Sequence, residues 1–520
     1  METHPERDLS VEQLVSGLQK VLITESGHIG SEILALSLEK LRDVEKQTVR
    51  VLSMIRSAMN ERRPVNRLPP EVFMRVLEFR DNDKVLDVAI KVCARWRSIL
   101  TSTPHLWTEV DFEYPARASL YLERSKSALV NVTVGKSRDA IVGPVGSFIG
   151  AIPWVARMKS LSLQTDMDQI KKIAERLCHK TPHLQHLTFE GKPRRYSYSY
   201  YSSAGTGGAI YVPREFLGRH APLLKSLTFH SVSPSVVFNF PMPNLTHIDW
   251  VAETAHVVIE ELLELFVSSP LIEVMTMDVL IRRTQMHEPL KQVTLSRLRK
   301  LTWADLDGSL SLIPCLIAPQ LSELSIKVTH NPRNERSTLS SVLSNDPNRI
   351  PLLLEPTAFE TIYKNGSRSC RFSYADDNAF LLIREVLKDR GTDSEIGRWF
   401  TPDIPFSFAG TKELTVEAAG GCPPVDDIPI EQFESLQKFD FMGETDSLIS
   451  LIRNTPSPEL SEIRIFPKEH YFPLDGLVEV LRQRRGSIFD GVKSVRIFGK
   501  DKCLRTQIKD LGKFVDVVAT

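Results

Sequence analysis

The sequence predicts a mixed α/β fold in which N-terminal helices and a small all-α module precede a solenoid of short parallel strands. Two observations predict this arrangement. Apolar residues recur at helical spacing in the first fifth of the chain, and a short apolar phrase then recurs to the C-terminus. We therefore expect a helical arm at residues 1–62, the all-α module at 63–112 and the solenoid at 113–520.

The first expected element is the helical arm. Ser10 and Gln13 form a capping box for a helix that carries apolar residues between positions 11 and 21. After two glycines, apolar residues continue in steps of three and four from Leu34 to Ala58. This narrow stripe suits a coiled-coil seam with a second copy of the chain or a helix that packs on its own chain, and both interpretations stay open.

The second element is the short helical module. Pro69-Pro70-Glu71 suits a first helical turn, because Pro lacks a donor that this turn cannot use and Glu favours the positive end of the helix dipole. Two apolar series at helical spacing follow, separated by the turn residues 81–83. A capped turn at 102–107 ends the module, and alternation at 110–112 indicates a strand. Helices this short need a partner or the following domain to cover their apolar surface.

This module resembles the F-box-like domain that is common in mushroom-forming fungi. The resemblance rests on Leu68-Pro69-Pro70-Glu71-Val72, on Cys93-Ala94-Arg95-Trp96 and on the ending Thr103-Pro104-His105-Leu106-Trp107. In that family the opening begins the first of three short helices, and the Cys-x-x-Trp helps to form the surface that binds the Skp adaptor of cullin-RING ubiquitin ligases. A departure is the stretch 79–83, where the family usually has a more apolar helix end. The resemblance implies adaptor contacts by Leu68, Pro69, Pro70, Val72, Val76, Val92, Cys93 and Trp96.

The third element is the recurring phrase L-x-x-L-x-L, with an apolar residue at each L. Most copies lie about 20 to 30 residues apart, the period of leucine-rich repeats, in which each unit supplies one parallel strand and one returning helix. Helical spacing at 169–178 and 257–267 fits such connections. The copies lack a consensus Asn or Cys ladder, so we expect irregular repeats. The clear copies are Leu184/Leu187/Phe189, Leu224/Leu227/Phe229, Leu245/Ile248/Trp250, Ile272/Met275/Met277, Leu298/Leu301/Trp303, Leu321/Leu324/Ile326, Leu436/Phe439/Phe441, Leu460/Ile463/Ile465 and Val492/Val495/Ile497.

Two segments interrupt the repeats. Residues 192–210 are rich in Tyr, Ser and Gly and are expected to project from the surface. They could stack on nucleic acid, anchor an interface or be an insertion without function. Residues 329–408 are expected to form an irregular repeat with long loops, which could divide the solenoid into two stacks.

The x positions of the phrase suggest a binding face. In a solenoid of this kind these positions align on one extended concave surface that can hold a protein partner. The face is polar and of mixed sign. The residues predicted to contact a protein substrate are Lys225, Thr228, His247, Asp249, Arg299, Lys300 and Glu323.

Composition and motif searches argue against other classes of protein. The formal net charge is +0 and the pI about 7.2, which gives no support to nucleic-acid binding. No apolar run is long enough for a membrane span, so we expect an intracellular protein of the cytoplasm or nucleus. The six cysteines form no C-x-x-C, and the pair His183 and His186 has no acid or thiol beside it, so no metal site or disulfide framework is expected. No catalytic or cofactor motif is present, and we expect neither an enzyme nor a cofactor.

Together these patterns favour the substrate-recognition adaptor of an SCF-type (cullin-RING) E3 ubiquitin ligase. Its F-box would bind the Skp adaptor, and through it the cullin, while the repeats would bind an unknown protein substrate. The alternative is a non-catalytic leucine-rich-repeat scaffold in which the F-box is only a structural cap. A hydrolase or transferase would need a clustered acid, base or nucleophile, and the sequence shows none.

Overall fold

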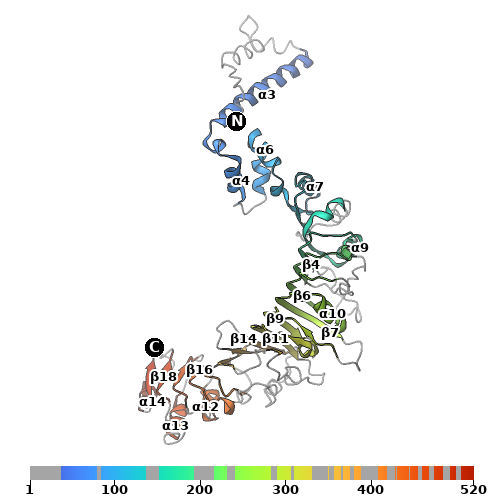
Figure 1. Cartoon of the computed structure of the whole chain (residues 1–520). Coiled ribbons are helices and arrows are strands. Elements are labelled where there is room, and N and C mark those ends of the chain that lie inside the picture. The colour runs from blue at the N-terminus through green and yellow to red at the C-terminus, as the bar shows by residue number, and fades with distance from the viewer. Residues whose placement is uncertain are drawn as a thin grey trace, which may run out of the picture. The chain divides into compact units, whose positions relative to one another are not determined.

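The chain divides into two compact units. The first comprises residues 1–108 and 120–128, and the second comprises 109–119 and 129–520. Helices form the first unit, and one large sheet dominates the second (Figure 1). The computed structural model describes residues 37–78, 84–135, 152–177, 179–192, 216–230, 241–282, 290–305, 310–330, 349–350, 356–364, 367–374, 380–387, 408–418, 428, 430–443, 445–454, 459–467, 474–483, 492–498, 505–513 and 515–519.

The arm is a single long helix in the described part of the chain, α3 (Leu38–Glu61). Ser37 caps its N-terminus, where the side-chain oxygen accepts a hydrogen bond from the Lys40 backbone N–H at 3.4 Å. The helix predicted from the apolar spacing after Leu34 is therefore confirmed from Leu38 onward. The earlier helix expected at residues 11–21 lies outside the described residues.

In the part of the helical module that the structure describes, five short helices follow α3. They are η1 (Pro64–Arg67), α4 (Pro70–Glu78), α5 (Lys84–Ala89), α6 (Ala94–Thr101) and η2 (Pro104–Trp107), where η denotes a 3-10 helix. The predicted helix start at the prolines is confirmed, because α4 begins at Pro70. The second apolar series is divided between α5 and α6. The 3-10 turn η1 was not predicted.

Trp107 is the centre of the core beneath these helices. Its side chain is fully buried, and its indole N–H donates to the Leu100 carbonyl at 2.8 Å. The Tyr121 ring meets it edge-on at 4.9 Å, and the Arg124 guanidinium lies 4.4 Å from the Trp107 ring centroid. Leu86 is also fully buried. The two segments of the first unit, residues 1–108 and 120–128, therefore contribute to one core.

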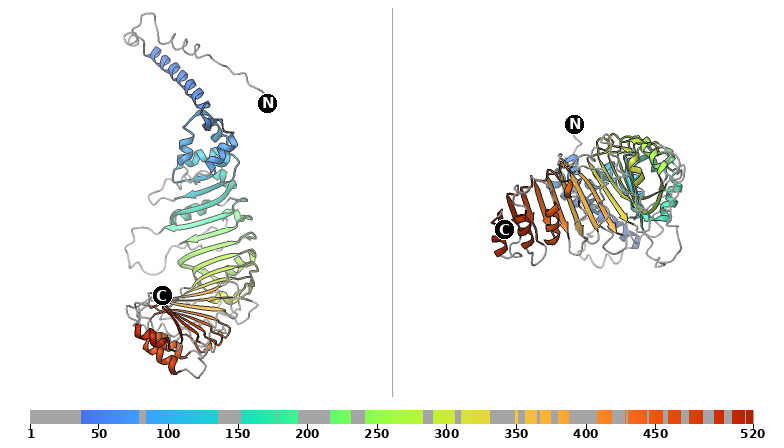
Figure 2. Two further views of the ribbon diagram at one scale, coloured as in Figure 1. Left: turned by 90° about the vertical axis from the view of Figure 1, so that its left-hand side faces the viewer. Right: turned by 90° about the horizontal axis from the view of Figure 1, so that it is seen from below.

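The second unit is built on a 17-stranded sheet. The pairings give the order β1-β2-β3-β4-β5-β6-β7-β9-β11-β14-β13-β12-β15-β16-β17-β18-β19. Neighbours are parallel except at β13, and Figure 2 shows them side by side. The strands are β1 (Glu109–Asp111), β2 (Val130–Val134), β3 (Met158–Asp166), β4 (His186–Lys192), β5 (Ser226–His230), β6 (His247–Val258), β7 (Val274–Arg282), β9 (Lys300–Asp305), β11 (Glu323–His330), β12 (Ala358–Lys364), β13 (Ser367–Ser373), β14 (Phe380–Leu387), β15 (Glu413–Ala418), β16 (Lys438–Met442), β17 (Glu462–Ile465), β18 (Ser494–Ile497) and β19 (Asp516–Ala519).

The segment 329–408 does not divide this sheet. It supplies β12, β13 and β14, of which β13 runs antiparallel to both neighbours. β14 pairs with β11, while β12 pairs with β15, so the sheet continues through the segment. The sequence indicated loops here because its apolar residues follow no copy of the phrase.

The connections between strands vary. Helices α9 (Met167–Arg176), α10 (Ile259–Ser268), α12 (Thr445–Asn454), α13 (Asp475–Gln483) and α14 (Arg505–Leu511) follow β3, β6, β16, β17 and β18. The first two confirm the helical spacing seen in the sequence. Between β9 and β11 the described residues instead hold η5 (Leu310–Cys315) and β10 (Leu316–Ile317), which pairs with β8 (Val293–Thr294). The expectation of one returning helix in every connection is therefore wrong there.

The phrase residues form the core of the second unit. Every apolar L position of the nine clear copies is buried. The parallel register places the last L of successive copies side by side, so that the rings of Phe189 and Phe229, and of Phe229 and Trp250, lie 5.5 Å apart. Alternation along each strand sends the second and third x residues of each copy to the opposite face of the sheet, and the first x residue lies at the edge, directly before the strand.

Candidate interaction surfaces

Exposed valines are the main feature of the helical module's surface. Among the described residues from 65 to 92, the exposed large hydrophobic side chains are six valines, at positions 65, 72, 76, 85, 88 and 92. Val72 and Val76 stand one turn apart on α4, where they are 45% and 60% exposed, and Val85 and Val88 form a similar pair on α5. Single exposed apolar residues are ordinary, but six in one small module indicate a surface that a partner covers.

The half-buried Trp96 connects α6 with η1 and α4. The Trp96 indole N–H donates to the Asn66 side-chain carbonyl, and its ring packs on Phe73 at 4.7 Å between centroids. The Arg95 guanidinium donates to the Leu68 carbonyl at 3.1 Å. Cys93 caps α6, since its sulfur accepts from the Trp96 backbone N–H at 3.5 Å. These contacts fix the residues that precede α4.

The eight residues predicted for adaptor contact therefore separate into two groups. Five are exposed, namely Pro69, Pro70, Val72, Val76 and Val92. Leu68, Cys93 and Trp96 are only half-exposed. Leu68, Cys93 and Trp96 contact other residues of the module, so in the structure they hold its helices together. The departure at 79–83 lies outside the described residues.

Sequence reasoning missed part of this surface. Val65, Val85 and Val88 are exposed, but none of them lies in the three stretches that carry the resemblance, 68–72, 93–96 and 103–107. Asn66 was also missed, although its amide both accepts from Trp96 and donates to the Asn60 carbonyl at 2.6 Å. The position of Asn66 directly before the motif gave no chemical signal in the sequence.

The polar face of the second unit's sheet is the other candidate surface. Its residues form rows, because parallel register puts equivalent positions of successive strands side by side. Ser160, His186, Ser226 and His247 make one such row across β3 to β6. None of the x positions of the clear copies is buried among the described residues. The face is therefore available to a ligand over many strands.

The predicted substrate residues all lie on this face or at its edge. Lys225 and His247 are exposed beside one another, since the His247 backbone N–H donates to the Lys225 carbonyl at 2.9 Å. Arg299 and Lys300 occupy the corresponding positions at β9. Four of the residues are engaged with neighbouring side chains. Asp249 lies 3.0 Å from His230, Lys300 lies 2.8 Å from Glu323, and the His247 Nδ1 lies 2.8 Å from the Thr246 hydroxyl oxygen.

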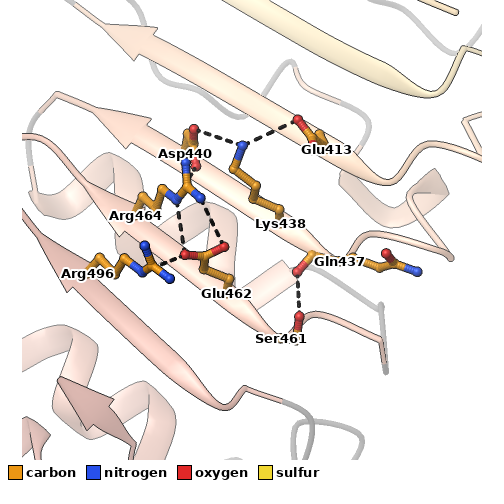
Figure 3. Close-up of polar contacts among 8 residues, drawn as sticks. All are labelled: Glu413, Gln437, Lys438, Asp440, Ser461, Glu462, Arg464 and Arg496. Carbon is orange, nitrogen blue, oxygen red and sulfur yellow. Dashed lines mark hydrogen bonds and ion pairs between the residues drawn. The ribbon is translucent and has the colours of Figure 1, made fainter. Parts of the chain in front are cut away.

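The most extensive polar network on the face joins β15 to β18 (Figure 3). Glu462 accepts from Arg464 at 3.1 and 3.3 Å and from Arg496 at 2.8 Å. Lys438 lies 3.4 Å from Glu413 and 3.6 Å from Asp440. The network thus contains three acids and three bases, and its charges compensate one another. Its residues lie far apart in the sequence, so sequence reasoning gave no sign of these pairs.

The pKa values of two carboxylates in this network are shifted in opposite directions. Burial raises the pKa of Asp440, although Lys438 and Arg464 oppose the shift. The hydrogen bond from Arg464 lowers the pKa of Glu462. The network therefore stabilises the charged form of Glu462, whereas burial disfavours the charged form of Asp440.

In the described residues, neither a metal site nor a membrane-spanning helix is found. Within the described ranges, no group of three or more His, Cys, Asp or Glu is arranged to hold a metal ion. The same part of the chain contains no helix long and apolar enough to cross a membrane. The Tyr-rich segment after β4 lies outside the described residues from position 193.

Comparison with known proteins identifies the helical module. Residues 65–113 match the family model described as F-box-like. The match begins at the exposed Val65, spans all three stretches that carry the resemblance and ends just beyond β1. No curated protein matches the chain. The chain thus contains an F-box-like domain, a kind of domain that generally binds Skp adaptors in SCF complexes.

Proposed function

We propose that this chain is the substrate-recognition adaptor of an SCF-type E3 ubiquitin ligase. In this proposal the F-box-like domain binds the Skp adaptor, which links the chain to the cullin, and the second unit binds a protein substrate. The proposal includes no catalytic residue and no cofactor, because the ligase partners supply the chemistry. It places the protein in the cytoplasm or nucleus, where these partners act.

The F-box-like match at residues 65–113 is the single observation that carries this proposal. The exposed valines support it independently of the match. An apolar patch that is left uncovered in a small helical domain would be stabilised by a partner, because burial contributes about 25 cal/mol per Å² of apolar surface. On this proposal Val72 and Val76 of α4 are central to the adaptor contact.

The second part of the proposal is that the 17-stranded sheet is an irregular leucine-rich-repeat solenoid. Parallel register, buried phrase residues and helices after several strands support this interpretation. The insertion of β12 to β14 and the connection through η5 and β10 make the repeats irregular. The polar x face would then be the substrate-binding surface.

Co-purification of the tagged chain with ligase components tests the proposal. The wild type should capture both the Skp adaptor and the cullin. The double substitution Val72→Glu and Val76→Glu should remove both, because a charge in an apolar interface is left without a partner. Val267→Glu is the matched control, since Val267 is 64% exposed on α10 of the other unit and should leave capture unchanged. If the wild type captures neither component, the scaffold alternative takes its place.

A further inference from the structure

A group of basic side chains gathers at one edge of the polar face. It consists of Lys159, His186, Lys225 and His247, called the basic cluster below, from four successive strand positions at β3 to β6. Backbone hydrogen bonds fix their spacing. The Gln185 N–H donates to the Lys159 carbonyl at 2.7 Å, and the Lys225 N–H donates to the Gln185 carbonyl at 2.8 Å. His186, Lys225 and His247 are exposed, and Lys159 is half-exposed.

The basic cluster has no internal charge compensation. Among the described residues, none of its four members forms an ion pair with a carboxylate. Asp249, two residues from His247, is engaged by His230 at 3.0 Å. Glu273 continues the same edge row directly before β7, next to Thr246, and forms no ion pair with the four basic residues. Glu190 lies four residues beyond His186 on β4. The contrast with the neutral network at β15 to β18 is direct, because there every charge has an opposite partner within 4 Å.

The electrostatics of His186 agree with this description. Burial lowers the pKa of its imidazole, and the three other basic side chains of the cluster lower it further. No carboxylate contributes to the shift. The positive charges therefore act on one another across the strands, and an anionic group placed among them would relieve this repulsion.

We infer that the basic cluster binds an acidic, extended segment of a protein substrate. This inference rests on the proposed function and adds the chemistry of the substrate. Strands lie about 4.8 Å apart, so the cluster spans roughly 14 Å, the length of about four extended residues. Carboxylates spaced along such a segment would each meet a basic side chain. Hydroxyl groups at Ser226 and Thr228 supply donors on the neighbouring positions of β5.

A peptide fits the cluster better than a nucleic acid does. The chain has a formal net charge of +0, so no wider positive field extends the cluster into the long track that a phosphate backbone requires. The face positions of β3 to β6 that the structure describes include no Tyr, Trp or Phe on which bases could stack. A short acidic peptide needs neither feature.

Fluorescence anisotropy with the purified full-length chain tests the inference. The probe is a labelled peptide of about ten residues that alternates Glu with Gly, and the same peptide with Gln in place of Glu is its control. The Glu peptide should bind and the Gln peptide should not. The double variant Lys159→Gln and Lys225→Gln should bind the Glu peptide about tenfold more weakly, since two exposed charge contacts are lost.

The matched control is the double variant Lys412→Gln and Lys493→Gln. These lysines are exposed at the equivalent edge positions before β15 and β18, far along the sheet from the basic cluster. Their replacement should change affinity by less than about twofold. All four substitutions are at the surface, and an unchanged thermal midpoint would show that each variant folds. An equal loss in both double variants would overturn the inference, and so would equal binding of the Glu and Gln peptides.

The pH dependence supplies a second readout. An acidic ligand raises the depressed pKa of His186, so binding takes up a proton and affinity should increase as the pH falls from about 8 to about 6. His186→Gln should flatten this dependence. An oligonucleotide of equal charge that bound more tightly than the Glu peptide, and through the same lysines, would make the cluster a nucleic-acid site. Failure of the peptide with intact adaptor capture would refute this inference alone, whereas peptide binding without adaptor capture would refute only the ligase role.

Discussion

Replacement of Leu227 by Ala tests the strand assignment at the centre of the second unit. Leu227 is 1% exposed on β5, and its direct neighbours in the register are Leu187 on β4 and Ile248 on β6. A buried Leu→Ala change costs about 2 to 5 kcal/mol, depending on how far the site collapses. Hydrogen bonds hold both flanking strands, so the cavity cannot close easily, and we expect about 3 to 5 kcal/mol. Ser226→Ala, one residue away on the polar face, should change stability by less than about 0.5 kcal/mol.

Hydrogen–deuterium exchange with peptide-level mass spectrometry is the suitable assay, because a long repeated sheet need not unfold in one step. Each 1.4 kcal/mol corresponds to a tenfold change, so exchange at 226–230 and 247–250 should accelerate about a hundredfold or more in the Leu227→Ala variant. Strands β16 to β18 serve as an internal control and should keep their protection. Equal acceleration by Leu227→Ala and Ser226→Ala would refute the assignment of inward and outward positions on β5.

Three further substitutions test other parts of the structure. Gly135→Ala should destabilise the second unit by about 1 to 3 kcal/mol in urea unfolding, because the φ of Gly135 is +84° and a Cβ would lie 2.8 Å from the Gln164 carbonyl oxygen. Gly512→Ala is the control and should be nearly neutral, because the atom nearest to a Cβ there is 3.4 Å away. Glu462→Gln should cost about 1 kcal/mol of unfolding free energy near neutral pH. The cost should be smaller in acid, because a carboxylate with a lowered pKa loses its stabilising charge as the pH falls. Asp440→Asn should cost less than Glu462→Gln at neutral pH, because it removes a carboxylate whose pKa is raised. Trp96→Phe should lower the stability of the helical unit in thermal unfolding by about 1 to 3 kcal/mol, because the buried Asn66 carbonyl loses its hydrogen-bond donor. Unchanged stability would contradict the hydrogen bond between Trp96 and Asn66.

Burial along the strands could be predicted from the sequence because alternation encodes it locally. Leu227 and Phe229 are apolar and buried, while Ser226 and Thr228 between them point to the other face. The same argument failed for residues 329–408. There β12 to β14 form antiparallel pairs, and strand order depends on contacts between distant residues rather than on a local pattern.

The helical module shows a different limit of sequence reasoning. Phe73 and Val76 stand three residues apart on one side of α4, yet Val76 is 60% exposed and Phe73 is buried. Periodicity identifies an apolar helix face, but it does not show how much of that face the neighbouring helices cover. The motif predicted that Cys93 and Trp96 are important, and the structure adds that Trp96 holds α6 against η1 and α4 while Cys93 caps α6.

Charge pairs on the sheet could not be predicted either. Lys438 and Glu413 are 25 positions apart, and their contact depends on β15 and β16 being adjacent in register. Single polar x residues looked alike in the sequence, so Lys300 and Lys225 were given the same role. The structure distinguishes them, because Glu323 pairs with Lys300 and no carboxylate among the described residues pairs with Lys225.

Titration of the purified chain with purified Skp adaptor in a calorimeter tests the central proposal most directly. We predict a one-to-one complex with a Kd of about 1 μM or tighter, as expected for a specific interface, and a loss of about a hundredfold when Val72 and Val76 are both changed to Glu. Val267→Glu should bind like the wild type. Absence of binding by the folded wild-type chain, or undiminished binding by the Val72→Glu and Val76→Glu variant, would contradict the proposed role of the F-box-like domain.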